Sequence, residues 1–169
     1  MSYTKPNLKS KYYDEFIKTV PSLKNKTIAI TGTTSGTGFV AANIVAEKGA
    51  KVILLNRNSD RSVSSYKKII KNNPKSEIIS ISCDLQDFNS VKNASDEVIS
   101  LCPSGLDVLC NNAGVMALKD IPTIDGFDIQ MQTNHLSHFL LTKNLLNCLE
   151  KAEQERGEAR IVNHSSIAR

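Results

Sequence analysis

The sequence has no tryptophan, few aromatic residues and no long hydrophobic segment. Its apolar runs are far shorter than the roughly 20 residues that a membrane-spanning helix needs, so we expect no membrane segment in these residues. Residues 1–11 are polar and carry lysines, without the apolar stretch of a secretory signal peptide. Neither membrane insertion nor secretion is therefore expected from this sequence.

Cysteines are also scarce, and their spacing argues against two kinds of site. Neither a Cys-x-x-Cys pair nor another metal-ligand spacing occurs among the four cysteines, which are Cys83, Cys102, Cys110 and Cys148. We therefore expect free thiols in a reducing, cytoplasmic environment and no disulfide framework. His135, His138 and His164 have no partners at metal-ligand spacing either, and we expect them to be packing or surface residues. No metal site is predicted.

A strong excess of charge of one sign is absent as well. The formal net charge is +4, with 22% charged and 5% aromatic residues. The positive charge is too small and too scattered to indicate a surface that binds nucleic acid, but it is compatible with an anionic cofactor. A chain of 169 residues has the size of one domain and can bury about 70% of the surface that its unfolded state exposes.

The sequence does contain a regular alternation of short apolar runs and segments with helical periodicity. Five strands are predicted over residues 26–31, 51–55, 78–83, 106–110 and 159–163, and helices over residues 10–20, 36–48, 60–73, about 87–101 and about 125–150. This alternation is typical of the doubly wound α/β (Rossmann) fold, a parallel sheet with helices on both faces. We therefore predict an N-terminal helical extension over residues 1–25 and a Rossmann domain over residues 26–169.

The stretch from Thr31 to Gly38 joins the first predicted strand to the next helix and contains three glycines. Gly32 permits a tight turn, Gly36 leaves room for a ligand, and Gly38 lets the helix begin close to the strand. Unpaired N–H groups at a helix N-terminus favour an anion, and a diphosphate suits this position. The spacing Gly-x-x-x-Gly-x-Gly differs from the common Gly-x-Gly-x-x-Gly, so a glycine-rich turn without a ligand is the alternative.

Polar residues follow every predicted strand. They are the glycine turn itself, Asn56-Arg57, Cys83-Asp84-Leu85, Asn111-Asn112-Ala113-Gly114 and Ser165-Ser166. Because the carboxyl ends of parallel strands meet at one edge of a sheet, where ligands of this fold bind, we expect these residues to converge on a single site.

The residues after the second strand bear on the choice of cofactor. Arg57 lies there, and no carboxylate occurs before Asp60. An acidic side chain at this point binds the ribose 2′-OH of NAD, whereas an arginine pairs with the 2′-phosphate of NADP. We therefore predict NADP(H) over NAD(H), the alternative being that Arg57 is only solvated.

Five motifs occur in order along the chain: TGTTSGTG (31–38), CDL (83–85), NNAG (111–114), TNHLSHFLLT (133–142) and RIVNHSS (160–166). Together they resemble the classical short-chain dehydrogenase/reductase family, most closely its retinol-dehydrogenase-like members, from about residue 26 to residue 169. The resemblance implies an oxidoreductase that interconverts an alcohol and a carbonyl compound by hydride transfer with NAD(P). It also implies a small-molecule substrate and a homo-oligomer.

The resemblance further implies roles for individual residues. Asn134 would hold a water in a proton relay, and Ser166 would hydrogen-bond the substrate oxygen as its charge changes. Asp84 would accept from the adenine amine, with an ordinary turn aspartate as the alternative. The residues implied to contact the cofactor are Gly32, Thr33, Thr34, Ser35, Gly36, Thr37, Gly38, Asp84, Leu85, Asn111, Ala113 and Gly114, the asparagines also tying the central sheet together.

One motif of the family is missing from these residues. The family's chemistry uses a Tyr-x-x-x-Lys pair after the serine, in which the tyrosine exchanges a proton and the lysine lowers its pKa. The sequence ends three residues after Ser166, and its tyrosines (Tyr3, Tyr12, Tyr13 and Tyr66) all lie upstream. We therefore expect a truncated chain with a sheet incomplete at its C-terminal side and without turnover. The alternative is a catalytically inactive dinucleotide-binding or protein-interaction module.

Overall fold

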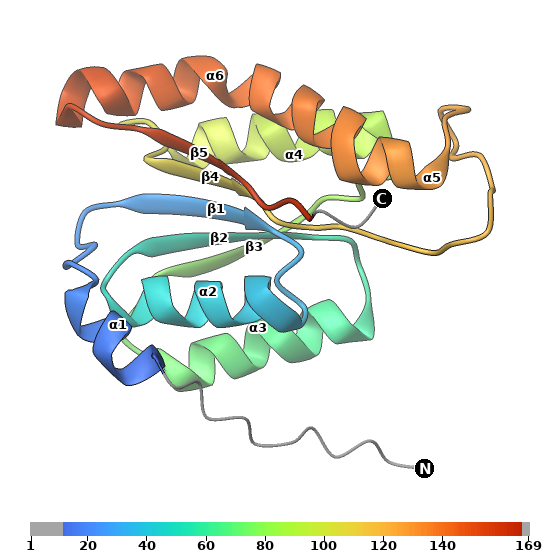
Figure 1. Cartoon of the computed structure of the whole chain (residues 1–169). Coiled ribbons are helices and arrows are strands. Elements are labelled where there is room, and N and C mark those ends of the chain that lie inside the picture. The colour runs from blue at the N-terminus through green and yellow to red at the C-terminus, as the bar shows by residue number, and fades with distance from the viewer. Residues whose placement is uncertain (1–11, 167–169) are drawn as a thin grey trace, which may run out of the picture.

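A parallel sheet of five strands forms the centre of the computed structural model, which describes residues 12–166 (Figure 1). The strands lie in the order β3-β2-β1-β4-β5, so the sheet changes its direction of growth between β1 and β4. Ligands of open α/β sheets bind at the carboxyl ends of the strands beside such a reversal. The strands are β1 (Thr27–Thr31), β2 (Lys51–Asn56), β3 (Ile78–Ser82), β4 (Val108–Asn111) and β5 (Arg160–Asn163).

Helices cover both faces of this sheet. On one face lie α2 (Gly36–Glu47) and α3 (Asp60–Asn72), and on the other lie α4 (Phe88–Leu101) and α6 (Ser137–Arg156) (Figure 1). The chain crosses to the second face after β3, when it returns past β1 to form β4. The doubly wound fold predicted from the alternation of apolar segments is confirmed.

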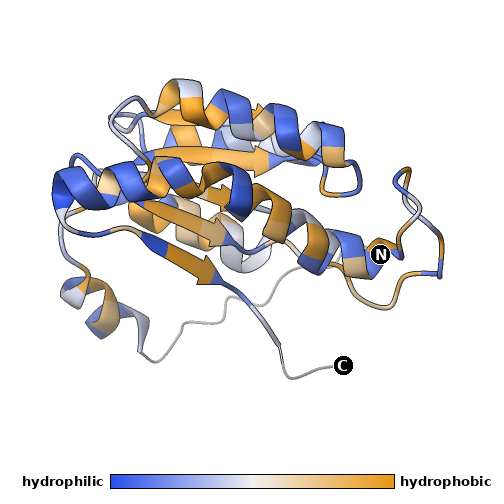
Figure 2. Cartoon of the chain, turned by 90° about the horizontal axis from the view of Figure 1, so that it is seen from above, coloured by the Kyte–Doolittle hydropathy of each residue, from blue (hydrophilic) through white to orange (hydrophobic). Residues whose placement is uncertain are grey.

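The two central strands are apolar along most of their length because helices cover them from both sides. Ala29 and Ile53 belong to the core beneath α4 and α6, whereas Ile28 and Val52 belong to the core against α2 and α3. All four residues are at most 4% exposed. Burial of each large aliphatic side chain contributes about 1.5–3 kcal/mol to stability. Figure 2 shows these hydrophobic strands beneath the helices of one face.

The segment before β5 departs from the predicted elements. Its periodicity predicts one helix over about 125–150, but the structure has α5 (Ile129–Met131), a π-helical turn η1 (Gln132–Leu136) and then α6. Residues 125–128 lie in a loop because the carboxylate of Asp125 accepts hydrogen bonds from Phe88 N (2.9 Å) and Gln132 Nε2 (2.6 Å). A π-helical turn of this kind often lies at a functional site.

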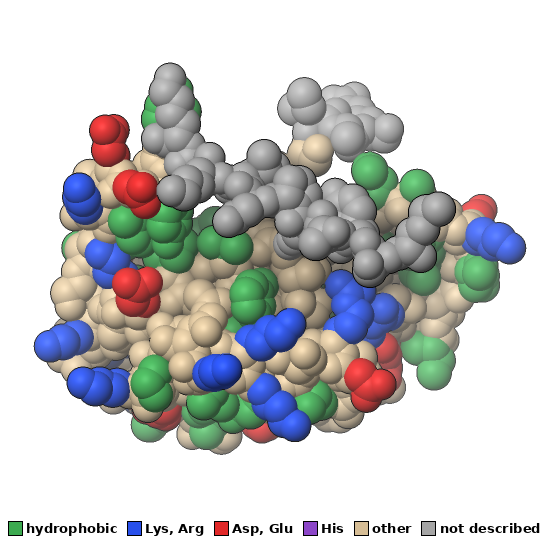
Figure 3. All heavy atoms as spheres, turned by 90° about the horizontal axis from the view of Figure 1, so that it is seen from below, with side chains coloured by type: hydrophobic (Ala, Val, Ile, Leu, Met, Phe, Trp, Pro, Cys, Tyr) green, Lys and Arg blue, Asp and Glu red, His purple; other side chains and the backbone are tan. Residues whose placement is uncertain are grey.

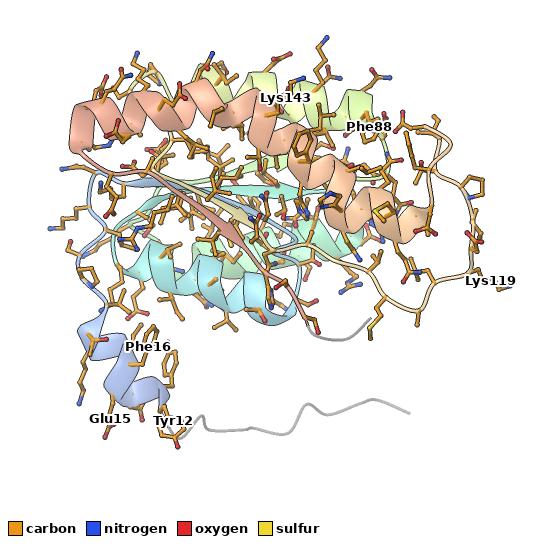
Figure 4. All side chains as sticks on the ribbon, turned by 45° about the horizontal axis from the view of Figure 1, so that its top comes forward. Tyr12, Glu15, Phe16, Phe88, Lys119 and Lys143 are labelled. Carbon is orange, nitrogen blue, oxygen red and sulfur yellow. The ribbon has the colours of Figure 1, made fainter. Side chains whose placement is uncertain are left out.

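Helix α1 (Tyr13–Thr19) belongs to the predicted N-terminal extension and lies near the amino ends of the strands. Phe16 projects from it and is exposed (Figure 4), while Lys48 Nζ donates to the Ile17 carbonyl oxygen at 2.8 Å. The rest of the extension, residues 1–11, lies outside the described residues. Within residues 12–166, no helix has both the length and the apolar character needed to cross a membrane.

A buried carboxylate lies at the amino end of the sheet. The Asp107 side chain is 3% exposed, forms ion pairs with Lys26 (3.1 Å) and Arg156 (2.7 Å) and accepts from Thr27 N (2.8 Å). Burial alone would raise the pKa of Asp107, but the bonds from Arg156, Thr27 and Lys26 outweigh it and hold this pKa below its usual value. Asp107 is therefore ionised and ties β1 to the end of α6.

One edge of the sheet presents apolar side chains to solvent. β5 pairs with β4, and within residues 12–166 no strand pairs with its other side. Ile161 and Val162 on β5 are 41% and 45% exposed. Such an edge is a template for pairing with a further strand.

Candidate functional site

The turn between β1 and α2 is shaped by contacts with the loop that follows β4. Gly32 has a φ of +71°, and a Cβ at this position would lie 2.8 Å from Ala113. A Cβ on Gly38 would overlap Asn112 Nδ2 and the carbonyl oxygen of Gly32. Glycine is required at both positions because two backbone segments touch there. Gly36 differs, since nothing lies within 4 Å of a Cβ built on it, and the turn is open on that side.

Asn56, the last residue of β2, holds the same turn from another direction. Its Oδ1 accepts from Thr33 N at 2.8 Å, and its Nδ2 donates to Thr33 Oγ1 at 2.7 Å. Both residues are buried. The sequence predicts that Thr33 offers its N–H and hydroxyl to the cofactor. Asn56 instead takes the N–H and donates to the hydroxyl oxygen, and Thr33 is fully buried outside the cleft lining, so it supports the turn from inside.

The loop over residues 111–115, here called the asparagine loop, is bonded to β1 and to the neighbouring elements. Asn112 Nδ2 donates to the carbonyl oxygens of Thr31 (2.9 Å) and Gly32 (3.2 Å). Asn111 Nδ2 donates to Thr142 Oγ1 (3.0 Å) on α6 and Asn163 Oδ1 (2.9 Å) on β5. The two asparagines therefore join the central strands, as the resemblance implies.

A cleft of about 400 Å³ lies between the glycine turn, the ends of β2 and β3 and the asparagine loop. This volume is in the usual range of small-molecule sites. The predicted residues that line it are Gly32, Thr34, Ser35, Thr37, Gly38, Arg57, Asp84, Leu85, Ala113 and Gly114. The predicted residues outside this lining are Thr33, Gly36, Asn111, Asn134 and Ser166. Most of the groups predicted at the carboxyl edge thus share one cavity.

One wall of this cleft is cationic. Arg57 and Arg61 both line it, and Arg61 Nη2 donates to Ser35 Oγ at 3.1 Å. Asp84 is the one acidic residue of the lining, and its Oδ1 accepts from Gln86 N at 3.0 Å, so that it also shapes the turn after β3. Figure 3 shows Lys and Arg side chains over the face that carries α2 and α3. The charge of the cleft therefore suits an anion.

Another part of the lining is apolar, with Leu55, Leu85 and Cys83. Burial raises the pKa of the Cys83 thiol to about 12, and the charge of Asp84 acts in the same direction. The thiol therefore stays protonated and behaves as a small hydrophobic group. Within residues 12–166, no three or more His, Cys, Asp or Glu side chains lie together so as to hold a metal ion.

Neither of the two predicted catalytic residues is part of the cleft lining. Asn134 is part of η1, and its side chain binds the backbone of Val115 twice, accepting from the N–H (2.8 Å) and donating to the carbonyl oxygen (2.8 Å). Ser166 is an exposed residue after β5. The side chain of Asn134 thus anchors the end of the asparagine loop, and the catalytic roles of both residues stay predictions.

Several cleft residues were not predicted from the sequence. Thr133 lines the cleft, and its Oγ1 is buried without a hydrogen-bond partner among the described residues. His164 also lines it and donates from Nδ1 to Asn112 Oδ1 at 3.0 Å. Thr133 and His164 belong to the motifs that also contain Asn134 and Ser166, so the sequence could have indicated both as site residues. No sequence signal indicated Arg61, because only the fold brings the start of α3 beside Ser35.

A family model described as short chain dehydrogenase matches residues 26–169. The chain belongs to this family. Short-chain dehydrogenases are oxidoreductases that bind NAD(P), and the cleft has the glycine turn and the polar strand ends that such a dinucleotide needs.

Relatives and solved structures agree with this assignment. The chain is 40% identical over 151 residues to an uncharacterized oxidoreductase of Schizosaccharomyces pombe, covering 88% of this chain and 44% of that protein. It is 33% identical over 165 residues to retinol dehydrogenase 12 of Mus musculus, covering 98% and 51%. The structure of NADPH-bound carbonyl reductase from chicken fatty liver has a TM-score of 0.69 at 28% identity, covering 86% and 61%. The chain spans about half the length of the curated relatives.

Proposed function

We propose that this short-chain dehydrogenase chain is the NADP(H)-binding part of an enzyme that interconverts an alcohol and a carbonyl compound. The observation that carries the cofactor preference is the cationic wall of the cleft. Arg57 and Arg61 line the cleft, and β2 ends there in the amide Asn56 instead of a carboxylate. A guanidinium pairs with a phosphate through two hydrogen bonds, whereas an acidic side chain repels it. The NADPH-bound carbonyl reductase supports this preference by analogy.

The remaining lining residues suit the rest of the dinucleotide. The N–H groups at the start of α2 bind the diphosphate, and the open space at Gly36 leaves room for it. Asp84 accepts from the adenine amine. The unpartnered hydroxyl of Thr133 is available to a polar group of the bound nucleotide.

NADP(H), when bound, supplies or accepts the hydride, and the residues of this chain bind and orient the reactants. Ser166 donates a hydrogen bond to the substrate oxygen, and Asn134 holds a water for proton exchange. Residues 1–169 contain no Tyr-x-x-x-Lys pair. Since the positioned proton donor contributes about 10²–10⁴-fold to the rate, we expect this chain to bind NADPH without measurable turnover.

The test is a calorimetric titration of the purified chain with 2′,5′-ADP and with 5′-AMP, which differ only in the 2′-phosphate. We expect 2′,5′-ADP to bind at least about tenfold more tightly, and Arg57→Ala to remove most of this difference. Lys143→Ala is the matched control, because this exposed cation lies on α6 on the other face of the sheet (Figure 4). Equal affinity for the two nucleotides would sink the NADP(H) assignment, and no binding of either would sink the cofactor site.

The second candidate is a dinucleotide-binding or interaction module without catalysis, favoured by the exposed side of β5. Ile161 and Val162 are exposed there, and Ile161 lines a groove together with Leu146 and Leu149 of α6. An assay of the whole protein distinguishes the two candidates. NADPH oxidation with carbonyl compounds there supports the enzyme. Nucleotide binding without turnover there supports the module.

Three further parts of the proposal concern the surroundings of the enzyme. The substrate is a small alcohol or carbonyl compound, and the protein self-associates. The third part is a cytoplasmic location, which is supported by the free thiols of the described cysteines (Cys83, Cys102, Cys110 and Cys148). Cell fractionation and sedimentation of the whole protein test the last two points.

A further inference from the structure

The hydroxyl group of Thr31, at the end of β1, lies among several hydrogen-bonding groups. Its Oγ1 accepts from Asn112 N and from Ala113 N, both at 2.9 Å. A hydroxyl group has two lone pairs and one hydrogen. The two N–H groups use both lone pairs, so only the hydroxyl hydrogen still needs an acceptor. The nearer acceptor for it is His138 Nε2 at 2.9 Å, and the Cys110 carbonyl oxygen lies at 3.5 Å.

This arrangement decides the tautomer of His138. Nε2 must be unprotonated to accept from Thr31, so a neutral ring carries its proton on Nδ1. Nδ1 lies 3.2 Å from the carbonyl oxygen of Asn134, to which it can donate. Burial lowers the pKa of His138, and the neighbouring His135 acts in the same direction, against the opposing effect of the Asn134 carbonyl. The ring is therefore neutral at pH 7.

The two bonds of this one imidazole reach both ends of the asparagine loop. On one side His138 orients the Thr31 hydroxyl, which holds the N–H groups of Asn112 and Ala113. On the other side it holds the backbone of Asn134, whose side chain binds Val115. Residues 112–115 all line the cleft. The shape of this wall thus depends on a buried side chain that does not line the cleft itself.

We propose that His138 is a positioning residue for nucleotide binding, which acts as the Nδ1–H tautomer and aligns the asparagine loop through Thr31 and Asn134. The proposal rests on the proposed function, because its readout is the affinity for NADPH. It replaces the expectation that His138 only fills space. A leucine of similar volume would leave the Thr31 hydroxyl hydrogen and the Asn134 carbonyl oxygen without their partner.

The first experiment compares His138→Leu, His138→Gln and His135→Gln by NADPH titration and by thermal unfolding. We expect His138→Leu to weaken NADPH binding by about tenfold or more, because it removes the nearer acceptor of the buried Thr31 hydroxyl and the side-chain bond to the Asn134 carbonyl oxygen. Glutamine carries both an acceptor and a donor, so His138→Gln should recover most of the affinity. His135→Gln is the matched control, since His135 is an exposed histidine of η1. Wild-type affinity in His138→Leu, or a loss in His138→Gln equal to that in His138→Leu, would overturn the proposal.

The second experiment reads the tautomer directly and does not depend on NADPH. In protein labelled with nitrogen-15 histidine, a long-range proton–nitrogen correlation spectrum distinguishes Nδ1–H from Nε2–H rings. The His138 signal is the one that His138→Gln lacks, and we expect the Nδ1–H pattern. An Nε2–H ring refutes the inference even if NADPH binds. An Nδ1–H ring in a protein that does not bind NADPH refutes the proposed function instead, and keeps the hydrogen-bond assignment.

Discussion

Gly38 lies in the first turn of α2, where the backbone of the glycine turn and the side chain of Asn112 come close to it. The carbonyl oxygen of Gly32 and the side chain of Asn112 occupy the space that a Cβ would need. Asn112 is itself held by Thr31, so the contact cannot relax by a rotation of one free side chain. At the scale of single residues, the cleft is therefore built from small or polar groups that bind one another. Some of the polar groups near the cleft are thus used to hold its wall and not to bind a ligand.

We predict that Gly38→Ala lowers the free energy of unfolding by about 3 kcal/mol, because the added methyl group meets backbone that cannot move away. Gly36→Ala should cost only about 1–2 kcal/mol, since its φ of +61° is unfavourable for alanine but its Cβ meets nothing within 4 Å. Urea unfolding of the two variants makes the comparison. Equal losses of stability would show that the contact with Asn112 does not constrain this position.

A second prediction concerns Asn56, whose amide lines the cleft while it holds Thr33. An aspartate can still accept from both Thr33 groups, so Asn56→Asp should keep the turn and add a negative charge beside Arg57. We expect NADPH affinity to fall about tenfold and the preference for NADPH over NADH to decrease or reverse. Asn58→Asp, with the same change of charge outside the cleft lining, is the control. An unchanged ratio of the two affinities contradicts the prediction.

At the scale of elements, the loop between β4 and α5 decides where the last long helix begins. Asp125 binds the backbone of Phe88 and the side chain of Gln132, and the rings of Phe88 and Phe127 lie 5.6 Å apart. Figure 4 shows Phe88 at the start of α4 and Lys119 on the outer part of this loop. The loop is thus fastened at its base, and η1 follows immediately with Asn134 in place.

We predict that Asp125→Ala lowers the free energy of unfolding by about 2–3 kcal/mol, since Phe88 N and the buried Gln132 amide lose their acceptor. NADPH affinity should fall as well, because η1 carries Thr133 and Asn134. Asp120→Ala, an exposed change in the same loop, should have little effect. Chemical denaturation and NADPH titration check both expectations. Full stability in Asp125→Ala would mean that the loop is held elsewhere.

At the scale of the whole molecule, the two ends of the sheet are stabilised differently. The carboxyl end has the cleft, whereas the amino end has the buried charge of Asp107 and its partners Lys26 and Arg156. The backbone carbonyl of Asp107 also accepts from Arg160 N at 2.8 Å, where β5 begins. Segments from both ends of the described chain therefore depend on one residue.

We predict that Asp107→Asn lowers the free energy of unfolding by about 3 kcal/mol at pH 7. The folded-state pKa of Asp107 is lowered, so its contribution is full above the unfolded-state pKa, near 3.9, and is lost as the pH falls through the folded-state value. The difference between wild type and variant should therefore vanish in acid. Urea unfolding across pH 2–7 measures it, with Glu158→Gln, at an exposed ion pair, as the control. A difference that persists at pH 2 contradicts the electrostatic explanation.

The sequence by itself determined the fold and the edge of the sheet at which the site lies. Continuous apolar runs such as residues 51–55 require burial on both faces, and this requirement with the glycine turn already specifies a doubly wound sheet. It also identified most of the cleft lining, because the carboxyl ends of parallel strands must meet. Both results follow from the local pattern of apolar residues and from the direction of the strands, which can be read from the order of residues.

Only the tertiary structure decided which predicted groups face the cleft and which face each other. Thr33 turned inward because Asn56, 23 residues away, binds it, and His138 became part of a network because Thr31, 107 residues away, lies beside it. Residues 125–128 stayed in a loop because Asp125 binds the Gln132 side chain, and this bond overrides the helical periodicity of that segment. Hydrogen bonds depend on distance and direction in space, which residue spacing along the chain does not define.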